Sequence, residues 1–272
     1  MLYIVATPIG NLGDMTIRAI ETLKSVDVIA CEDTRNSKKL LSHFEIDKPL
    51  IAYHKFNERT SAEGIIKLLD EKKDVALISD SGTPLISDPG NILTKTLRER
   101  GYDYTVVPGA NAALCALILS GLDISRFTFV GFLPEKQSQK EELLSSLCDR
   151  EETLVFHVSC HNIKDDLNII FKMLGPRPAC LVKEITKLHE NAVNFTLGKD
   201  VEIDERGEFI LVVEKLNKNN EKIIKNNSDN SQKLINEVNN FINLGLKKNE
   251  AIKLVARINK EDKDKIYKLF FN

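Results

Sequence analysis

The stretch Ser79–Gly90, which reads SDSGTPLISDPG, decides the fold expected for this chain. It follows the apolar run Val75–Ile78, which is typical of a strand buried on both faces of a parallel sheet. A helical pattern over Asn91–Arg100 comes next. Open α/β sheets bind their ligands where a strand runs into such a loop and then a helix.

The composition of this loop favours a ligand-binding loop over a plain turn. Twelve residues hold two Gly, two Pro and two Asp. Gly lets a backbone approach a ligand, Pro stiffens the loop, and each Ser-Asp pair offers acceptors. The same residue types also make ordinary turns and helix caps, which is the alternative interpretation.

The same strand and helix alternation recurs along the chain and predicts an α/β protein. A first run of strands ends with the strand Phe127–Gly131, and a second run begins at Thr153. The expected strands are Leu2–Ala6, Val26–Cys31, Leu50–Tyr53, Val75–Ile78, Tyr104–Val107, Phe127–Gly131, Thr153–Phe156, Ala179–Val182 and Phe209–Val213. The expected helices are Thr16–Ser25, Asn36–Phe44, Arg59–Glu71, Asn91–Arg100, a small-residue helix to Ser120 and one ending at Leu174.

Two further loops follow expected strands. Gly10-x-x-Gly13 is neither the dinucleotide fingerprint nor a P-loop, so a standard NAD or ATP site is disfavoured. Glu32-Asp33-Thr34-Arg35 ends the second strand and suits contact with a polar substrate. The alternative is that Asp33 or Thr34 caps the next helix while Arg35 pairs on the surface.

Composition bounds the class of protein. The chain has 272 residues, which is long enough for two compact domains. Its residues are 42% hydrophobic and 29% charged, which is typical of a globular protein. No apolar run is long enough to span a bilayer, and no signal peptide is expected. The five Cys form no Cys-x-x-Cys pair, so reduced thiols and a cytoplasmic location are expected.

The tail differs from the rest of the chain. Residues 217–272 carry a local charge of +5, whereas the rest carries −7. Residues 217–232 are rich in Asn, Lys and Ser and are expected to form a linker. Residues 233–272 predict a basic module of three short helices, similar to a helix-turn-helix domain. Binding a polyanion and serving as a dimerisation or stabilising appendage are both open for it.

One cluster invites a metal site, which we do not predict. His157, Cys160 and His161 lie close in sequence, but no fourth ligand has suitable spacing.

Several of these stretches, taken together, resemble one family. The motifs occur in the order and spacing of the tetrapyrrole-methylase-like (class III) methyltransferases, in particular those acting on small-subunit ribosomal RNA. The resemblance is strong over about residues 1–216. The motifs are Thr7–Asn11, Glu32–Arg35, Ser79–Gly90, Val107–Ala112, Gly131–Pro134 and Lys183–Glu190.

The resemblance implies a function and an architecture. The methyl donor would be S-adenosylmethionine, in a cleft between two α/β domains. The product would be a 2′-O-methylated cytidine in the decoding region of 16S rRNA, within the 30S subunit. The enzyme would be cytoplasmic and a homodimer. The domains would be 1–118 with the main cofactor loops, 119–216 closing the cleft, the linker 217–232 and the module 233–272.

The resemblance and the residue chemistry together nominate site residues. Glu32, Asp33 and Glu184 are the candidate catalytic carboxylates. Arg35, Lys183 and Lys187 are candidates for holding the RNA backbone. The expected cofactor-binding residues are Pro8, Asp80, Gly82, Thr83, Leu85, Ile86, Ser87, Pro108, Gly109, Asn111 and Ala112.

One segment departs from the family pattern. Where the family reads Tyr-Glu-Ser-Pro-His-Arg, residues 157–162 read His-Val-Ser-Cys-His-Asn, so the Glu and the Arg are absent. This departure keeps open a non-catalytic RNA-binding assembly factor. A methyltransferase acting on a tetrapyrrole is the other alternative, although such a substrate needs neither the Glu32–Arg35 run nor the basic tail.

Overall fold

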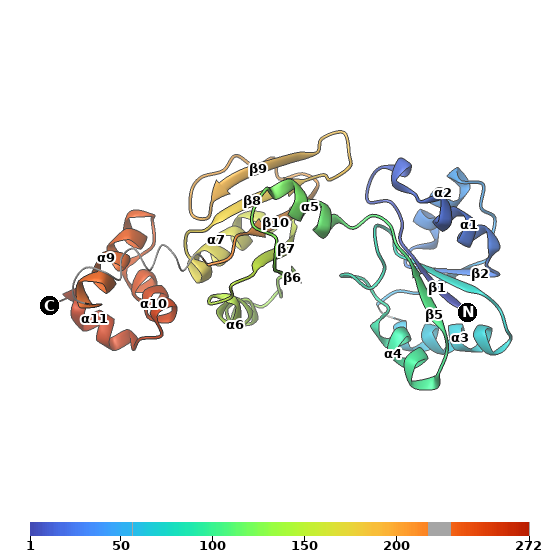
Figure 1. Ribbon diagram of the computed structural model, residues 1–272, viewed down its shortest axis with the longest axis horizontal. Coiled ribbons are helices and arrows are strands. Elements are labelled where there is room, and N and C mark those ends of the chain that lie inside the picture. The colour runs from blue at the N-terminus through green and yellow to red at the C-terminus, as the bar shows by residue number, and fades with distance from the viewer. Residues whose placement is uncertain (56, 217–229, 272) are drawn as a thin grey trace. The chain divides into compact units, whose positions relative to one another are not determined.

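The computed structural model describes residues 1–55, 57–216 and 230–271 (Figure 1). Contacts divide the chain into two compact units, and each is described by itself. The first comprises Met1–Ala112 with Ile185–Leu188, and the second comprises Ala113–Glu184 with His189–Asn272. The expected domain ranges, with a boundary after residue 118, stay a prediction.

The first unit is built on a parallel sheet of five strands in the order β3-β2-β4-β1-β5. β4 is buried along its whole length, as its apolar sequence predicts. The strands are β1 (Leu2–Val5), β2 (Val28–Cys31), β3 (Leu50–Ala52), β4 (Val75–Ile78) and β5 (Tyr104–Val107).

Helices cover both faces of this sheet (Figure 1). Apolar residues of α1 (Ile17–Ser25) and α2 (Thr34–His43) form a core on one face. Those of α3 (Glu58–Asp70) and α4 (Asn91–Arg100) form a second core on the other. A short 3₁₀ helix, η1 (Leu12–Asp14), follows β1.

The second unit holds a mixed sheet in the order β6-β7-β10-β8-β9. Only β6 and β7 are parallel within it; the other neighbouring pairs are antiparallel. The strands are β6 (Phe127–Phe132), β7 (Thr153–Ser159), β8 (Pro178–Lys183), β9 (Asn191–Thr196) and β10 (Glu208–Val213). The helices before the tail are α5 (Ala112–Ser120), α6 (Gln137–Leu147) and α7 (Ile163–Leu174).

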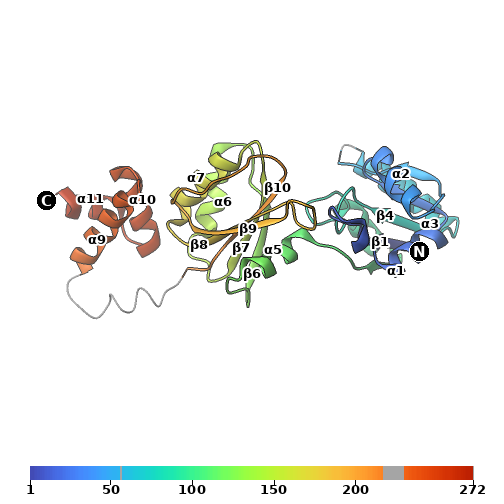
Figure 2. The ribbon, with the colours of Figure 1, turned by 90° about the horizontal axis from the view of Figure 1, so that it is seen from above.

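Three helices end the chain, α9 (Asn230–Asn243), α10 (Lys248–Asn259) and α11 (Lys263–Phe271) (Figure 2). Their apolar residues, among them Val238, Ile252 and Ile266, belong to the same core cluster as those of α6 and α7. Phe241 and Leu254 pack over Gly175 at the end of α7. These contacts dock the three helices on the second unit.

Ion pairs support the same interface. Lys172 of α7 pairs with Glu250 of α10 at 3.3 Å, and Asp149 pairs with Lys260 at 3.2 Å. The three expected tail helices are therefore present. The expected linker lies outside the described residues over 217–229, and α9 already begins at Asn230.

The predicted α/β class is confirmed, and several expected elements need correction. The strand Phe127–Gly131 does not close the first run, because β6 pairs with β7 in the second sheet. The strand from Thr153 continues to Ser159 instead of ending at Phe156. α2 begins at Thr34, two residues before the expected start, because Asp33 caps it. α6 and β9 were not expected from the sequence.

Within the described part of the chain, no helix is long and apolar enough to cross a membrane. All five cysteines lie in described segments and are free thiols.

Candidate active site

Three loops meet at the carboxyl end of the first sheet. They follow β1, β4 and β5, which are neighbours in the order β4-β1-β5. The backbone N–H of Thr7 donates to the Gly82 carbonyl at 2.8 Å, and the Thr83 hydroxyl donates to the Ala110 carbonyl at 3.0 Å. The loops after β1 and β5 are thus both tied to the loop after β4. The three loops that carry the expected cofactor-binding residues therefore gather at one edge of the sheet.

Close backbone approach explains the glycines of these loops. Gly82 has a φ of +79°, and a Cβ there would lie 3.1 Å from Cγ2 of Ile9. Gly109 packs on Ala6, whose Cβ would lie 3.0 Å from an added Cβ. Leu85 and Ser87 also hold positive φ values of 73° and 69°, which is uncommon for residues with side chains. Such strain gathers at functional sites when the surroundings enforce it.

Glu58 enforces the conformation at the end of the loop 79–90. Its carboxylate oxygen Oε1 accepts from the N–H groups of Gly90 at 2.8 Å and Ile92 at 3.1 Å. The hydroxyl of Tyr53 donates to the same oxygen at 3.2 Å. Since the first N–H groups of a helix lack partners within it, Glu58 caps α4 from the start of α3.

A group of carboxyl groups lies at the same edge. Asp80 accepts from the backbone N–H of Asp33 and from the side-chain amide of Asn36, both at 3.1 Å. Burial raises the pKa of Glu32, and Asp80 raises it further. Burial, with the charge of Glu32 next in size, raises the pKa of Asp88 to about 6. The edge therefore disfavours negative charge, and a bound cation would relieve the repulsion between these groups.

Asp33 and Arg35 form a local unit at the start of α2. The Asp33 carboxylate accepts from the backbone N–H of Arg35 at 2.8 Å and from Nη2 of its guanidinium at 2.8 Å. The side-chain hydrogen bond from Arg35 lowers the pKa of Asp33 to about 2. The Arg35 side chain is nonetheless 87% exposed, so it remains open to a second partner.

Lys187 lies beside the first loop. Gly10 has a φ of +146°, and a Cβ there would lie 2.5 Å from Cγ of Lys187. The aliphatic part of Lys187 therefore packs over Gly10, at the carboxyl end of β1. Any side chain at position 10 would displace it.

Lys183 and Glu184 lie in the second unit, in a cluster of their own. Nζ of Lys183 pairs with Asp204 at 2.8 Å, and Asp204 also binds Arg206. The Glu184 carboxylate accepts from the backbone N–H of Glu208 at 2.9 Å. Glu184 has a φ of +50°, so this turn is strained.

The segment that departs from the family pattern is partly strand. His157 lies in β7, with its ring 5.4 Å from that of Phe129 and 5.1 Å from that of Phe132. Burial lowers the pKa of His157. Across the described segments, no three His, Cys, Asp or Glu side chains gather in a way that could hold a metal ion.

Asp88 and Glu58 were not among the residues nominated from the sequence. Asp88 lies in the loop 79–90, and its place in a Ser-Asp pair was the sequence feature that could have indicated a functional role. Glu58 gave no signal, because its partner Gly90 is 32 positions away.

The chain is similar to known proteins of one family. The family model for tetrapyrrole (corrin/porphyrin) methylases matches residues 1–199. The chain is 42% identical to Ribosomal RNA small subunit methyltransferase I of Halalkalibacterium halodurans, covering 99% of this chain and 94% of that protein. It is also 42% identical to the protein of that name from Bacillus subtilis strain 168, covering 98% and 92%.

A solved structure shows the same fold. The uroporphyrin-III C-methyltransferase of Thermus thermophilus matches with a TM-score of 0.54 at 20% identity, over 79% of this chain and 94% of that one.

The fold is that of the class III methyltransferases, and the chain belongs to the tetrapyrrole methylase family. Within that family its nearly full-length relatives carry the name Ribosomal RNA small subunit methyltransferase I. The chain is accordingly a methyltransferase, and its methyl donor is S-adenosylmethionine.

The residues at the sheet edge fit this donor. S-adenosylmethionine carries a sulfonium cation, and the edge holds the carboxyl groups of Glu32, Asp80 and Asp88. Gly82 and Gly109 keep the backbone free of side chains where the loops converge.

Proposed function

We propose that the chain methylates the 2′-hydroxyl of a cytidine in the decoding region of 16S rRNA. The observation that carries this proposal is the match of relatives named for small-subunit rRNA over 98% or more of the chain. The loops at the carboxyl end of the first sheet support it, because they fit the donor.

The donor supplies an electrophilic methyl group, and the protein supplies position and electrostatics. The residues that would hold it are those of the three converging loops, with Glu32, Asp80 and Asp88 facing its positive charge. The positions nominated from the sequence for this role are Pro8, Asp80, Gly82, Thr83, Leu85, Ile86, Ser87, Pro108, Gly109, Asn111 and Ala112.

A ribose hydroxyl is a weak nucleophile and needs a proton acceptor. We assign this role to Glu32, because its raised pKa makes it a better acceptor than Asp33. The pKa of about 2 at Asp33 suits a residue that orients Arg35 instead. Glu184 is the second candidate, and its bond to the Glu208 N–H fixes its carboxylate.

We assign the binding of RNA phosphates to basic side chains. Arg35 is exposed and oriented by Asp33, so its guanidinium can reach a phosphate without losing its carboxylate partner. Lys183 and Lys187 are assigned the same task, with Asp204 and Gly10 fixing their positions.

We further propose that the chain acts in the cytoplasm on 16S rRNA within the 30S subunit, and that it does so as a homodimer. Exposed apolar side chains support the dimer: Ile118 of α5 is 73% exposed, and Phe127 and Phe132 are exposed on the edge strand β6. Large apolar patches on a surface mark interaction sites.

The test is methyl transfer from a labelled donor to three substrates, namely 30S subunits, protein-free 16S rRNA and uroporphyrinogen III. The proposal predicts label in rRNA only. Label in the tetrapyrrole would favour a small-molecule methyltransferase. RNA binding without any transfer would favour an assembly factor.

A matched variant tests the role of Glu32. Glu32→Gln keeps the shape of the side chain and removes the acceptor, so turnover should fall by about 10²–10⁴-fold. Donor affinity, measured by calorimetry, should fall far less than turnover, because Asp80 and Asp88 still face the positive charge of the donor. Unchanged turnover would transfer the role to Glu184 or Asp88.

A further inference from the structure

The last helix, α11, exposes two neighbouring aromatic rings, whose planes are tilted by 38°. Tyr267 is 44% exposed and Phe271 is 51% exposed, and their ring centres lie 4.5 Å apart. The helix has other apolar residues for packing: Ile266 is fully buried, and Leu269 and Phe270 pack on the core of the second unit. The two exposed rings therefore form a surface that docking of the helix does not use.

Lysines surround these rings. Nζ of Lys248, at the start of α10, lies 5.8 Å from the centre of the Phe271 ring. Lys263 shares a helix stripe with Tyr267, since residues four apart lie on one face. Lys268 directly follows Tyr267, lies three residues before Phe271 and is exposed. We call Tyr267, Phe271, Lys248, Lys263 and Lys268 the aromatic–lysine surface.

The surroundings leave this surface positive. Residues 230–272 hold nine Lys and Arg against five Asp and Glu. Three of the five acids are engaged with lysines outside the surface: Glu237 with Lys233, Glu250 with Lys172 and Glu261 with Lys265. No ion pair within the described residues engages Lys248, Lys263 or Lys268.

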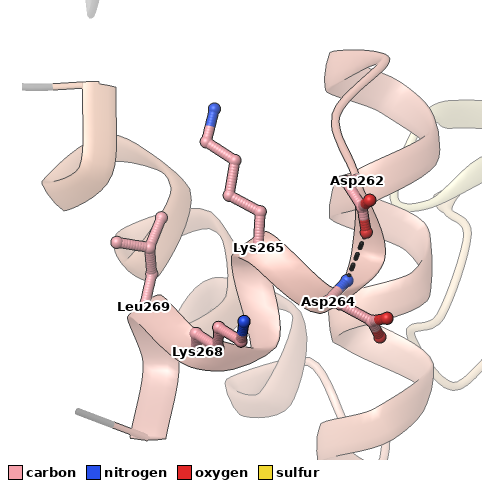
Figure 3. A pocket seen from close by; sticks show the side chains of 5 residues that line it. All are labelled: Asp262, Asp264, Lys265, Lys268 and Leu269. Carbon is pink, nitrogen blue, oxygen red and sulfur yellow. Dashed lines mark hydrogen bonds between the residues drawn. The ribbon is translucent and has the colours of Figure 1, made fainter.

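The remaining two acids lie in a neighbouring pocket. Asp262 accepts from the backbone N–H of Asp264 at 2.7 Å, and both line this pocket with Lys265, Lys268 and Leu269 (Figure 3). Its mixed charge makes it a poor anion site. The rings and the lysines of α10 and α11 are thus the feature that a partner would recognise.

Exposed rings beside lysines are suited to a single-stranded nucleic acid. Each base offers a flat face to an aromatic ring, and each phosphate accepts an ammonium group. A helix pair of aromatic residues alone contributes only about 0.2–0.5 kcal/mol to the helix, so exposure of both rings is not explained by helix stability.

We infer that the three C-terminal helices bind an unpaired stretch of RNA, with Tyr267 and Phe271 stacking on its bases and Lys248, Lys263 and Lys268 on its phosphates. The inference rests on the proposed function, which makes an RNA the substrate. It adds a binding surface in the tail, separate from the residues assigned to donor and acceptor.

The test measures binding of the full chain to a fluorescent oligouridylate by anisotropy, beside an abasic strand and a duplex of equal length. Phe271→Ala and Tyr267→Ala should each weaken oligouridylate binding on the order of tenfold. Neither should change binding of the abasic strand. Phe271→Leu keeps an apolar side chain without an aromatic face, so it should bind nearly as poorly as Phe271→Ala.

Two lysines provide a matched pair. Lys268→Ala should reduce the salt dependence of binding by about one phosphate contact. Lys265→Ala removes the same charge next to Glu261, and should change the salt dependence less. Thermal unfolding of each variant identifies any variant that fails to fold. In that case, binding by Phe271→Leu is the measurement that tests the inference.

Three results would overturn the inference. They are equal affinity of the ring variants and the wild type, wild-type affinity of Phe271→Leu, and a change of oligomeric state on ring substitution, which would assign the rings to a second copy of the chain. Methyl transfer to 30S subunits by the same variants separates the two claims. If the wild type methylates rRNA and the ring variants bind normally, only the inference fails.

Discussion

Gly82→Ala is expected to weaken donor binding more than it weakens the fold. With a φ of +79°, the position would strain any L-residue by about 1–2 kcal/mol. The new Cβ would also lie 3.1 Å from Cγ2 of Ile9 and 3.7 Å from the Ala110 carbonyl oxygen. Crowding of this kind costs about 1–3 kcal/mol. Because it displaces the loops that line the donor site, donor affinity should fall about tenfold or more.

Gly101 provides the matched control. It has a φ of +74° at the end of α4, and a Cβ there would meet nothing within 4 Å. Gly101→Ala therefore carries the same backbone strain without the crowding. Both variants should unfold a few degrees below the wild type, and calorimetry with S-adenosylmethionine should show lost affinity for Gly82→Ala alone. Wild-type affinity of Gly82→Ala, or equal losses in both variants, would refute the reasoning.

Three further predictions follow from the same structure. Glu58→Ala removes the cap of α4 and should lower the free energy of unfolding by about 1–2 kcal/mol, with faster hydrogen exchange at the Gly90 and Ile92 amides. Unchanged exchange would show that the cap is dispensable. Asp88→Asn should stabilise the protein at pH 7 by at most about 3 kcal/mol, because the folded pKa of Asp88, about 6, lies above its unfolded value and wild-type stability therefore falls as pH rises from about 4 to 6. Denaturant unfolding should show this gain at pH 7 and not at pH 4, and an equal gain at both pH values would contradict the prediction. Truncation after Leu216 should lower the melting temperature, because the tail shares the core of the second unit, and it should flatten the salt dependence of rRNA affinity. An unchanged melting temperature would show that docking of the tail contributes nothing to stability.

The strands were predictable because their cause is local. Val75–Ile78 is buried on both faces and reads as a continuous apolar run, so pattern and structure agree on its ends. The edge strand β9, Asn191–Thr196, has no such run, because most of its side chains are exposed or half-buried. The helix α6 buries only Leu144 and Leu147, so its amphipathic signal is weak.

Pairing between strands was not predictable, because it depends on contacts far apart in sequence. β6 was expected to end the first run of strands, yet it pairs with β7 of the second sheet. A strand carries no mark of the sheet that it will join. The same limit applies to the tail, whose apolar residues predicted three helices and left open what they pack against.

The candidate site divides in the same way. The loops that follow β1, β4 and β5 were found from Gly, Pro and Asp, since turn chemistry is written in the sequence. The raised pKa of Asp88 and the three bonds to Glu58 depend on residues brought together only by folding. Asp33 shows the reverse case, where a residue nominated for catalysis also caps a helix.

The most direct measurement of the central claim is nucleoside mass spectrometry of 16S rRNA after reaction of 30S subunits with a donor carrying a deuterated methyl group. We predict deuterated 2′-O-methylcytidine at one position of the decoding region, formed about 10²–10⁴-fold more slowly with Glu32→Gln. Label on a base, on another nucleoside or on no rRNA at all would contradict it.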